Sequence, residues 1–253
     1  MEDLSTPNLA PSEKNLWNWI DILLILIGIG AIFALGLILL GPILNISEVN
    51  SEGEAAITLG QSLSLALLEA VAIVGGVYFL GMRRHNLDWK SVGLTPLSTR
   101  WLVAGIVISA IVIPLSGLIA LLIMLALGQP LENPQLGFLI PEGFSWLGAI
   151  GMVAFGGLAV PFAEELFFRG VLYVWLKGRW GVWLAVLLSS AIFGIVHVDL
   201  SVGGAAFVLG IILALAYEYS NSLWTSIMIH AVNNSVKIII LYALVASGMN
   251  LGL

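Results

Sequence analysis

Seven apolar stretches, each long enough to cross a lipid bilayer, dominate this 253-residue sequence. The hydrocarbon core of a bilayer is about 30 Å thick and takes roughly 20 helical residues to cross. Backbone groups inside it find no water, so each stretch is expected to be an α-helix. Only 9% of the residues are charged, whereas a soluble domain carries about 25%. The sequence therefore predicts an all-α, polytopic transmembrane bundle of about seven to eight spans. The stretches run approximately over 17–41, 55–82, 101–127, 144–176, 181–198, 203–219 and 223–247.

Basic residues lie in alternate connections between these stretches. Lys14 precedes the first stretch, four basic residues lie between the second and the third, and Lys177 and Arg179 follow the fourth. The intervening connections contain acidic residues but neither Lys nor Arg. Because cytoplasmic loops are enriched in Lys and Arg, we expect an integral protein of a prokaryotic plasma membrane with its N-terminus in the cytoplasm. Seven spans place the C-terminus outside, and an eighth, broken helix would reverse that end only.

Charge and cysteine content exclude several classes of function. Nine Lys and Arg against fifteen Asp and Glu give a net charge of −6, which leaves no basic face for nucleic acid. The absence of cysteine excludes disulfides, thiolate zinc ligands and a cysteine nucleophile. The expected partners are membrane lipids and molecules held in or at the membrane.

Ionisable residues within the apolar stretches are the most informative feature of the chain. Each costs roughly 2.5–3.5 kcal/mol on insertion scales, so each calls for a structural or functional reason. All but one lie after residue 160, which points to a site in that region. They are Glu69, Glu164, Glu165, Arg169, His197, His230 and Lys237, with Asn233 and Asn234 beside them.

The segment PFAEELFFRG, residues 161–170, contains two adjacent glutamates with different expected roles. Glu165 and Arg169 are four residues apart with the acid first, which favours an ion pair on one helix face. Glu164 points about 100° away from that face. We therefore expect Glu165 and Arg169 to neutralise each other and Glu164 to remain available as a general base.

Two later segments place histidines where they could join Glu164. In a helical hairpin that turns near residue 179, Glu164 would lie about 22 Å and His197 about 27 Å from the turn along their respective arms. The two side chains would therefore lie at similar depth in the membrane. Phe193 shares a helix face with His197, and His230 shares one with Asn234. His230 lies only about 10 Å into its own stretch, so the hairpin would have to project past the cytoplasmic surface for all three to meet.

This constellation suggests hydrolysis of a peptide bond in a membrane-associated polypeptide. Glu164 and His197 would activate a water, and His230 with Asn234 would stabilise the oxyanion. No G-x-S-x-G elbow is present, so we expect water rather than a side chain to be the nucleophile. Zn²⁺ held by Glu164, His197 and His230 is the alternative activator. The sequence has no H-E-x-x-H, and we favour activation without a cofactor.

Two other classes of protein share these features. A proton-coupled transporter would also bury carboxylates and histidines, but two related halves with broken helices are expected there and no such symmetry is present. A non-catalytic membrane scaffold or a bacteriocin self-immunity protein with an unused site would have the same sequence pattern.

Three motifs also resemble those of a known family. EELFFRG, FGIVH and HAVNN are similar to the motifs E-E-x-x-x-R, F-x-x-x-H and H-x-x-x-N of the CPBP family, which includes CAAX prenyl proteases and bacteriocin-processing enzymes. The resemblance covers about residues 145–247 and has all three motifs in order. It implies Glu164, His197, His230 and Asn234 as catalytic residues, supported by Glu165, Arg169 and Phe193.

The resemblance also carries expectations for the whole chain. It implies an all-helical intramembrane endopeptidase with its site open toward the cytoplasm. The family is often labelled a metalloprotease, whereas its eukaryotic members resemble glutamate-dependent enzymes, so both mechanisms stay open. The expected organisation is a cytoplasmic tail (1–16), three N-terminal transmembrane helices (17–127), a catalytic core (144–247) and a C-terminal tail (248–253).

Overall fold

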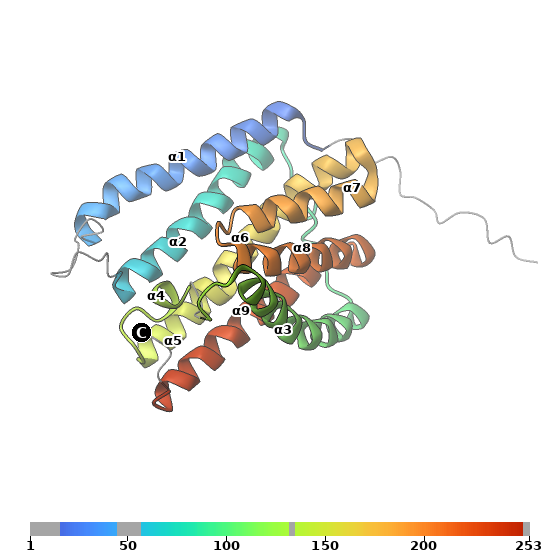
Figure 1. Cartoon of the computed structure of the whole chain (residues 1–253). Helices are drawn as coiled ribbons and strands as arrows, with labels where there is room; N and C mark the ends of the chain where they lie inside the picture. Colours follow the sequence, from blue (N-terminus) through green and yellow to red (C-terminus); the bar gives the residue numbers. More distant parts are fainter. Residues whose placement is uncertain (1–15, 45–56, 132–134, 250–253) are drawn as a thin grey trace, which may run out of the picture.

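The computed structural model describes residues 16–44, 57–131 and 135–249. Every regular element in these ranges is a helix, which confirms the all-α prediction. Six of the helices are long and apolar enough to cross a membrane, and in Figure 1 the long helices form one bundle. The elements are α1 (Trp19–Leu44), α2 (Leu59–Gly75), α3 (Thr99–Leu127), α4 (Leu136–Leu139), α5 (Trp146–Met152), α6 (Val160–Phe167), α7 (Val174–Ile195), α8 (Leu200–Ser220) and α9 (Leu223–Ala246), with π-helical segments at Gly76–Met82, Val153–Ala159 and Phe168–Tyr173 and a 3₁₀ turn at Arg83–His85.

The predicted fourth and fifth stretches form a single helical run, Trp146–Ile195, that reverses within α7. Gly181 has φ 76° and ψ 174°, which glycine adopts readily because it has no Cβ. Phe168 and Phe193 lie at nearly equal distances in sequence on either side of this glycine, and their ring centroids are 4.9 Å apart. The run is therefore a hairpin, with its turn close to the predicted position.

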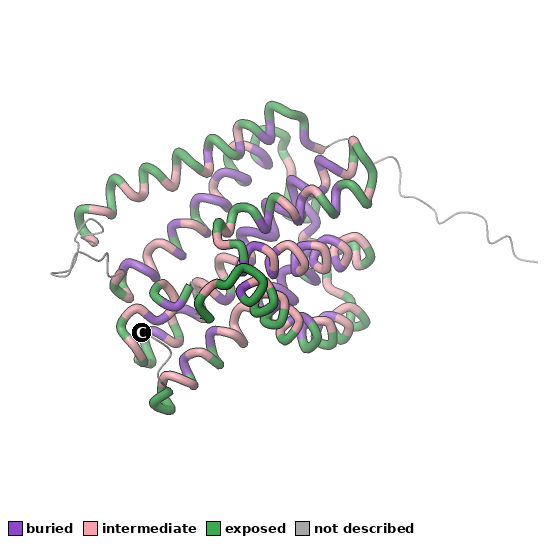
Figure 2. The backbone as a smooth tube through the Cα atoms, in the orientation of Figure 1, coloured by how far each residue is buried: buried purple, intermediate pink, exposed green. Residues whose placement is uncertain are grey.

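The outer helices of the bundle expose apolar side chains, and the inner helices hold most of the buried residues. α1 and α3 expose apolar side chains over most of their length, whereas buried residues concentrate in α6, α8 and α9 (Figure 2). Exposed apolar surface on this scale needs lipid rather than water around it. The chain is an integral membrane protein.

α7 and α8 pack with their backbones nearly in contact. A Cβ added at Gly203 would lie 2.7 Å from the carbonyl oxygen of Gly194, and one added at Gly210 would lie 3.0 Å from Ser190. Small residues permit such close approach of membrane helices.

Replacing Gly203 with Ala is expected to destabilise the α7–α8 contact by about 1–3 kcal/mol, because the added methyl group meets backbone that cannot move aside cheaply. The thermal midpoint of the purified protein in detergent measures this. Gly30→Ala in α1 is the matched control, since nothing lies within 4 Å of its added Cβ. Equal midpoints for the two variants would contradict the close packing.

Candidate active site

The predicted ion pair of Glu165 and Arg169 lies at the centre of the bundle. Arg169 Nη1 donates to Glu165 Oε1 at 2.7 Å, and both side chains are fully buried. Arg169 Nη2 also donates to the carbonyl of Gly210 in α8 at 3.0 Å. Its guanidinium lies 4.8 Å from the ring centroid of Phe193. The pair therefore connects α6, α7 and α8, and it is the ion pair expected for Glu165 and Arg169.

His230 of α9 lies between the two carboxylates. Its Nδ1 is 2.9 Å from Glu165 Oε1, and its Nε2 is 3.6 Å from Glu164 Oε2. A carboxylate accepts hydrogen bonds, so Nδ1 carries the proton in the first contact. Glu165 thus orients the imidazole, and Nε2 is directed toward Glu164.

His197 lies just beyond the end of α7 and is held by its own helix. Its Nδ1 donates to the carbonyl of Phe193 at 2.7 Å, which leaves Nε2 as an acceptor. The Phe193 ring packs edge-on against both His197 and His230, with centroids 4.9 and 5.6 Å apart. Phe193 therefore contacts both histidines.

Asp199, which could have oriented His197 from the loop, caps α8 instead. Its Oδ1 accepts hydrogen bonds from the backbone of Ser201 and Val202 and from the Ser201 hydroxyl. These bonds, above all that from the hydroxyl, hold the pKa of Asp199 below its usual range. The ring of His197 is thus oriented by the Phe193 carbonyl.

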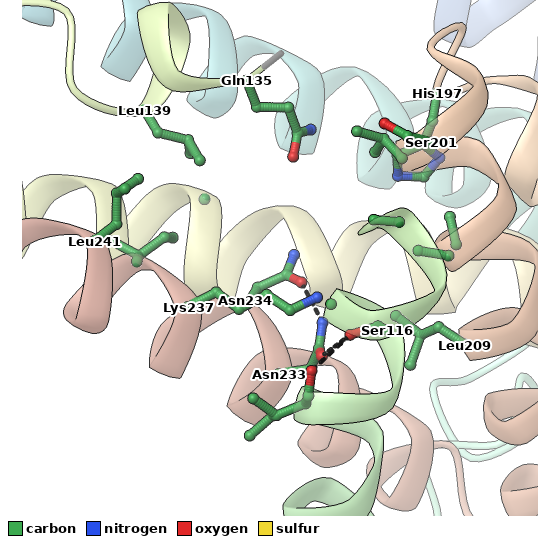
Figure 3. Close-up of a pocket in the computed structure, with 18 of the residues that line it drawn as sticks. Ser116, Gln135, Leu139, His197, Ser201, Leu209, Asn233, Asn234, Lys237 and Leu241 are labelled. Atoms are coloured by element: carbon green, nitrogen blue, oxygen red, sulfur yellow. Dashed lines mark hydrogen bonds between the residues drawn. The ribbon is translucent and has the colours of Figure 1, made fainter. Parts of the chain in front are cut away.

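The two asparagines of α9 have distinct contacts. Ser116 of α3 donates to Asn233 Oδ1 at 3.4 Å, a hydrogen bond that joins α3 to α9. Asn233 Nδ2 donates to Asn234 Oδ1 at 3.0 Å. The nitrogen of Asn234 is therefore directed into the neighbouring space (Figure 3).

These residues line one cavity of about 700 Å³. It brings together Glu164, His197, His230 and Asn234, which come from three separate segments of the sequence. Glu69 and Lys237, two further ionisable residues of the apolar stretches, also line it, as do Ser116, Gln135 and Ser201. In Figure 3, Gln135 faces Asn234 and Lys237 across the cavity. No sequence pattern identified Ser116 or Gln135, because each is an ordinary polar residue in a region without motifs.

The carboxylates and imidazoles at this site are not arranged as the ligands of a metal ion. In the part of the chain that the structure describes, no group of three or more His, Cys, Asp or Glu side chains could hold a metal ion. Glu165 and one nitrogen of each histidine are engaged in the hydrogen bonds described above.

The site is thus a cluster of a glutamate, two histidines and an asparagine that line one cavity, in which Glu164 and His230 are buried. Residues 145–236 match the profile of the family described as type II CAAX prenyl endopeptidase Rce1-like. The chain is also 27% identical over 155 residues to the Bacillus subtilis protein "Putative membrane peptidase YdiL", covering 61% of this chain and 60% of that protein. No solved structure matches the chain. The two matches confirm the resemblance to the CPBP family that the three motifs carry.

Proposed function

We propose that this protein is an intramembrane endopeptidase that uses Glu164 to activate water against a peptide bond of a membrane-associated polypeptide. The observation that carries this proposal is the different environment of the two adjacent glutamates. Glu165 bonds to Arg169 and His230, whereas no hydrogen bond holds Glu164 among the described residues and its side chain lines the cavity. A carboxylate free to take a proton beside a substrate-sized space is what a general base requires.

Each residue of the site has its own role in the proposed hydrolysis. Glu164, with His197 Nε2 nearby in the cavity, takes a proton from water as its oxygen attacks the carbonyl carbon. The Asn234 amide and, in its imidazolium form, His230 Nε2 donate to the oxyanion. The carbon–nitrogen bond then breaks, and Glu164 returns the proton to the leaving amine. Arg169 and Glu165 hold His230 in place.

The proposal includes the orientation of the chain in a prokaryotic plasma membrane. The start of α1, the loop after α2, the α7 turn and the α8–α9 turn meet at one end of the bundle, which we call the basic end. Three contacts join these segments. Arg84 forms an ion pair with Asp21, Arg179 donates hydrogen bonds to the carbonyl of Trp17, and the Leu223 amide donates to the carbonyl of Gly93. We place the basic end in the cytoplasm because Lys and Arg are enriched there.

Chelation separates this mechanism from its zinc-dependent alternative. We expect purified protein in detergent to cleave a panel of membrane peptides at the same rate with and without 1,10-phenanthroline, because the proposed base needs no metal. Product formation is followed by mass spectrometry. Loss of turnover with the chelator, restored by added Zn²⁺, would favour the zinc mechanism instead. A protein that cleaves nothing, and whose Glu164→Gln variant leaves the phenotype in cells unchanged, would favour the scaffold.

A further inference from the structure

The cavity extends from Glu164 in one direction only. α3 and α9 begin at the basic end, and their lining residues start only at Ile113 and His230 and continue to Met124 and Leu244. The part of the run that precedes the turn at Gly181 begins at the opposite end, at Trp146, and its lining residues are Gly156, Val160 and Glu164. Each helix thus lines the cavity with the half that lies away from the basic end.

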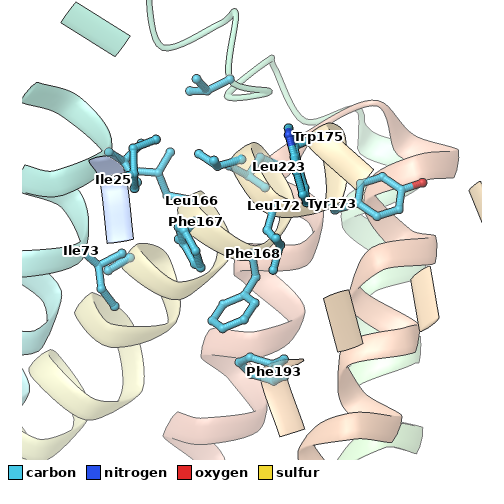
Figure 4. Packing of buried hydrophobic residues seen from close by; sticks show 14 of the residues in the cluster. Ile25, Ile73, Leu166, Phe167, Phe168, Leu172, Tyr173, Trp175, Phe193 and Leu223 are labelled. Atoms are coloured by element: carbon cyan, nitrogen blue, oxygen red, sulfur yellow. The ribbon is translucent and has the colours of Figure 1, made fainter. Parts of the chain in front are cut away.

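The opposite direction is filled by the hydrophobic core. Beyond Glu164 toward the basic end, the chain continues into Leu166, Phe167, Phe168 and Leu172, all buried in one cluster with Leu223. Figure 4 shows Phe168 directed toward Phe193, with Leu172 and Tyr173 alongside. Within the described residues, large side chains therefore lie between the catalytic cluster and the basic end.

A second hairpin, which we call the α7–α8 hairpin, is formed by the returning part of α7 (residues 182–195) and α8. It ends beside the catalytic cluster and leaves space between the cluster and the end of the bundle opposite the basic end. From Val182 to Ile195 the returning part of α7 has 14 residues, about 21 Å, which is short of the roughly 30 Å core of a bilayer. The apolar tip is exposed, with Val198 89% accessible. His197 follows α7 at this tip. The hairpin thus enters from the basic end and stops beside the active site.

The cavity reaches the surface of the molecule away from the basic end. Its exposed lining residues lie in the outer half of α3, on either side of the α3–α4 connection and in α9 (Gly117, Leu121, Leu131, Gln135 and Ile240), and at the hairpin tip beside the active site (Val196). Glu164, Phe193 and His230, which form its inner end, are buried. In the described chain this end carries no Lys or Arg in its loops.

We propose that the substrate reaches Glu164 from the non-cytoplasmic side of the membrane, an inference that rests on the proposed function. Its class is a membrane-anchored polypeptide whose scissile bond lies at or just inside that surface. The cavity lies between α3 and α9, with Leu131 and Gln135 among its lining residues, so an extended segment could pass Gln135 and Lys237 on its way to the catalytic cluster (Figure 3). The family resemblance implies a site open toward the cytoplasm, and the geometry points the other way.

The absence of cysteine makes the route directly testable by single-cysteine labelling. Leu241→Cys places a thiol in the cavity near its mouth, Gly137→Cys one on the exposed surface of the same end, and Lys90→Cys one at the basic end. In right-side-out membrane vesicles we expect a charged, membrane-impermeant maleimide to label Leu241→Cys and Gly137→Cys but not Lys90→Cys. Inside-out vesicles should give the reverse.

Each outcome of the labelling decides one point. Labelling of Leu241→Cys from the same side as Lys90→Cys overturns the proposed route, as does labelling from neither side when Gly137→Cys reacts. An inverted pattern, with Lys90→Cys labelled from outside, overturns the cytoplasmic placement of the basic end and with it the side of access. Folding of each variant is checked by a single symmetric peak in size-exclusion chromatography.

A substrate pair separates failure of the route from failure of the proposed function. One cleavable segment is attached to a single transmembrane anchor on the cytoplasmic side and, in a second fusion, on the non-cytoplasmic side. We expect at least a tenfold faster cleavage of the second fusion. Faster cleavage of the first overturns the route while supporting the peptidase, and cleavage of neither counts against the peptidase itself.

Discussion

Replacing Glu164 with Gln is expected to lower the rate of peptide cleavage by about 10²–10⁴-fold, the contribution typical of a general base. The amide keeps the size of the side chain but cannot take a proton from water. Because Glu164 takes no part in the ion pair of Glu165 and Arg169, the bundle should remain folded. The measurement is kcat for a membrane-anchored peptide, together with the thermal midpoint of both proteins in detergent.

Glu218→Gln is the matched control for this substitution. Glu218 accepts hydrogen bonds from Lys177 and Tyr173 and does not line the cavity. An ion pair of this partly exposed kind contributes about 1 kcal/mol or less, so turnover should not change. If Glu164→Gln cleaved as fast as Glu218→Gln, Glu164 could not be the base.

Replacing Arg169 with Met is expected to produce the largest loss of stability, about 3–5 kcal/mol. The substitution leaves the Glu165 carboxylate fully buried without its guanidinium, and a buried charge that loses its partner is costly. It also removes the bond to Gly210 that links this pair to α8. The free energy of unfolding, measured by denaturant titration in mixed micelles, should fall accordingly.

The double variant Glu165→Gln/Arg169→Met tests the cause of that loss. With both charges gone, much of the lost stability should return, because no uncompensated charge remains. Activity should not return, since Glu165 no longer orients His230 through its Nδ1. Lys177→Met, which breaks a partly exposed pair, is the control and should cost about 1 kcal/mol or less. A double variant less stable than Arg169→Met alone would contradict this account of the ion pair.

The sequence predicted the features that depend on local spacing. Four-residue separations predicted the pair of Glu165 with Arg169, and the length of the apolar stretches predicted the helices. The basic residues near 179 predicted the turn that Gly181 makes. Each of these depends on helix geometry, which residues close in sequence determine.

The sequence predicted that distant helices bring the site residues together, but not the detailed packing between those helices. The sequence paired Glu164 with His197 across a hairpin. In the structure α9 places the imidazole of His230 between Glu164 and Glu165, so His230 is the histidine in contact with Glu164. The direction of the cavity depends on where the α7–α8 hairpin stops, and no spacing rule gives that. The individual roles of His197 and Asn234, and the absence of a required cofactor, stay predictions.

The identity of the nucleophile tests the central claim most directly. Cleavage of a membrane-anchored peptide is carried out in H₂¹⁸O, and both the new carboxyl terminus and the quenched intact enzyme are weighed by mass spectrometry. If Glu164 activates water for direct attack, the product carries one heavy oxygen and the enzyme no added mass at any time point. A peptidyl adduct on the enzyme during turnover would contradict direct attack by water and replace it with a covalent mechanism.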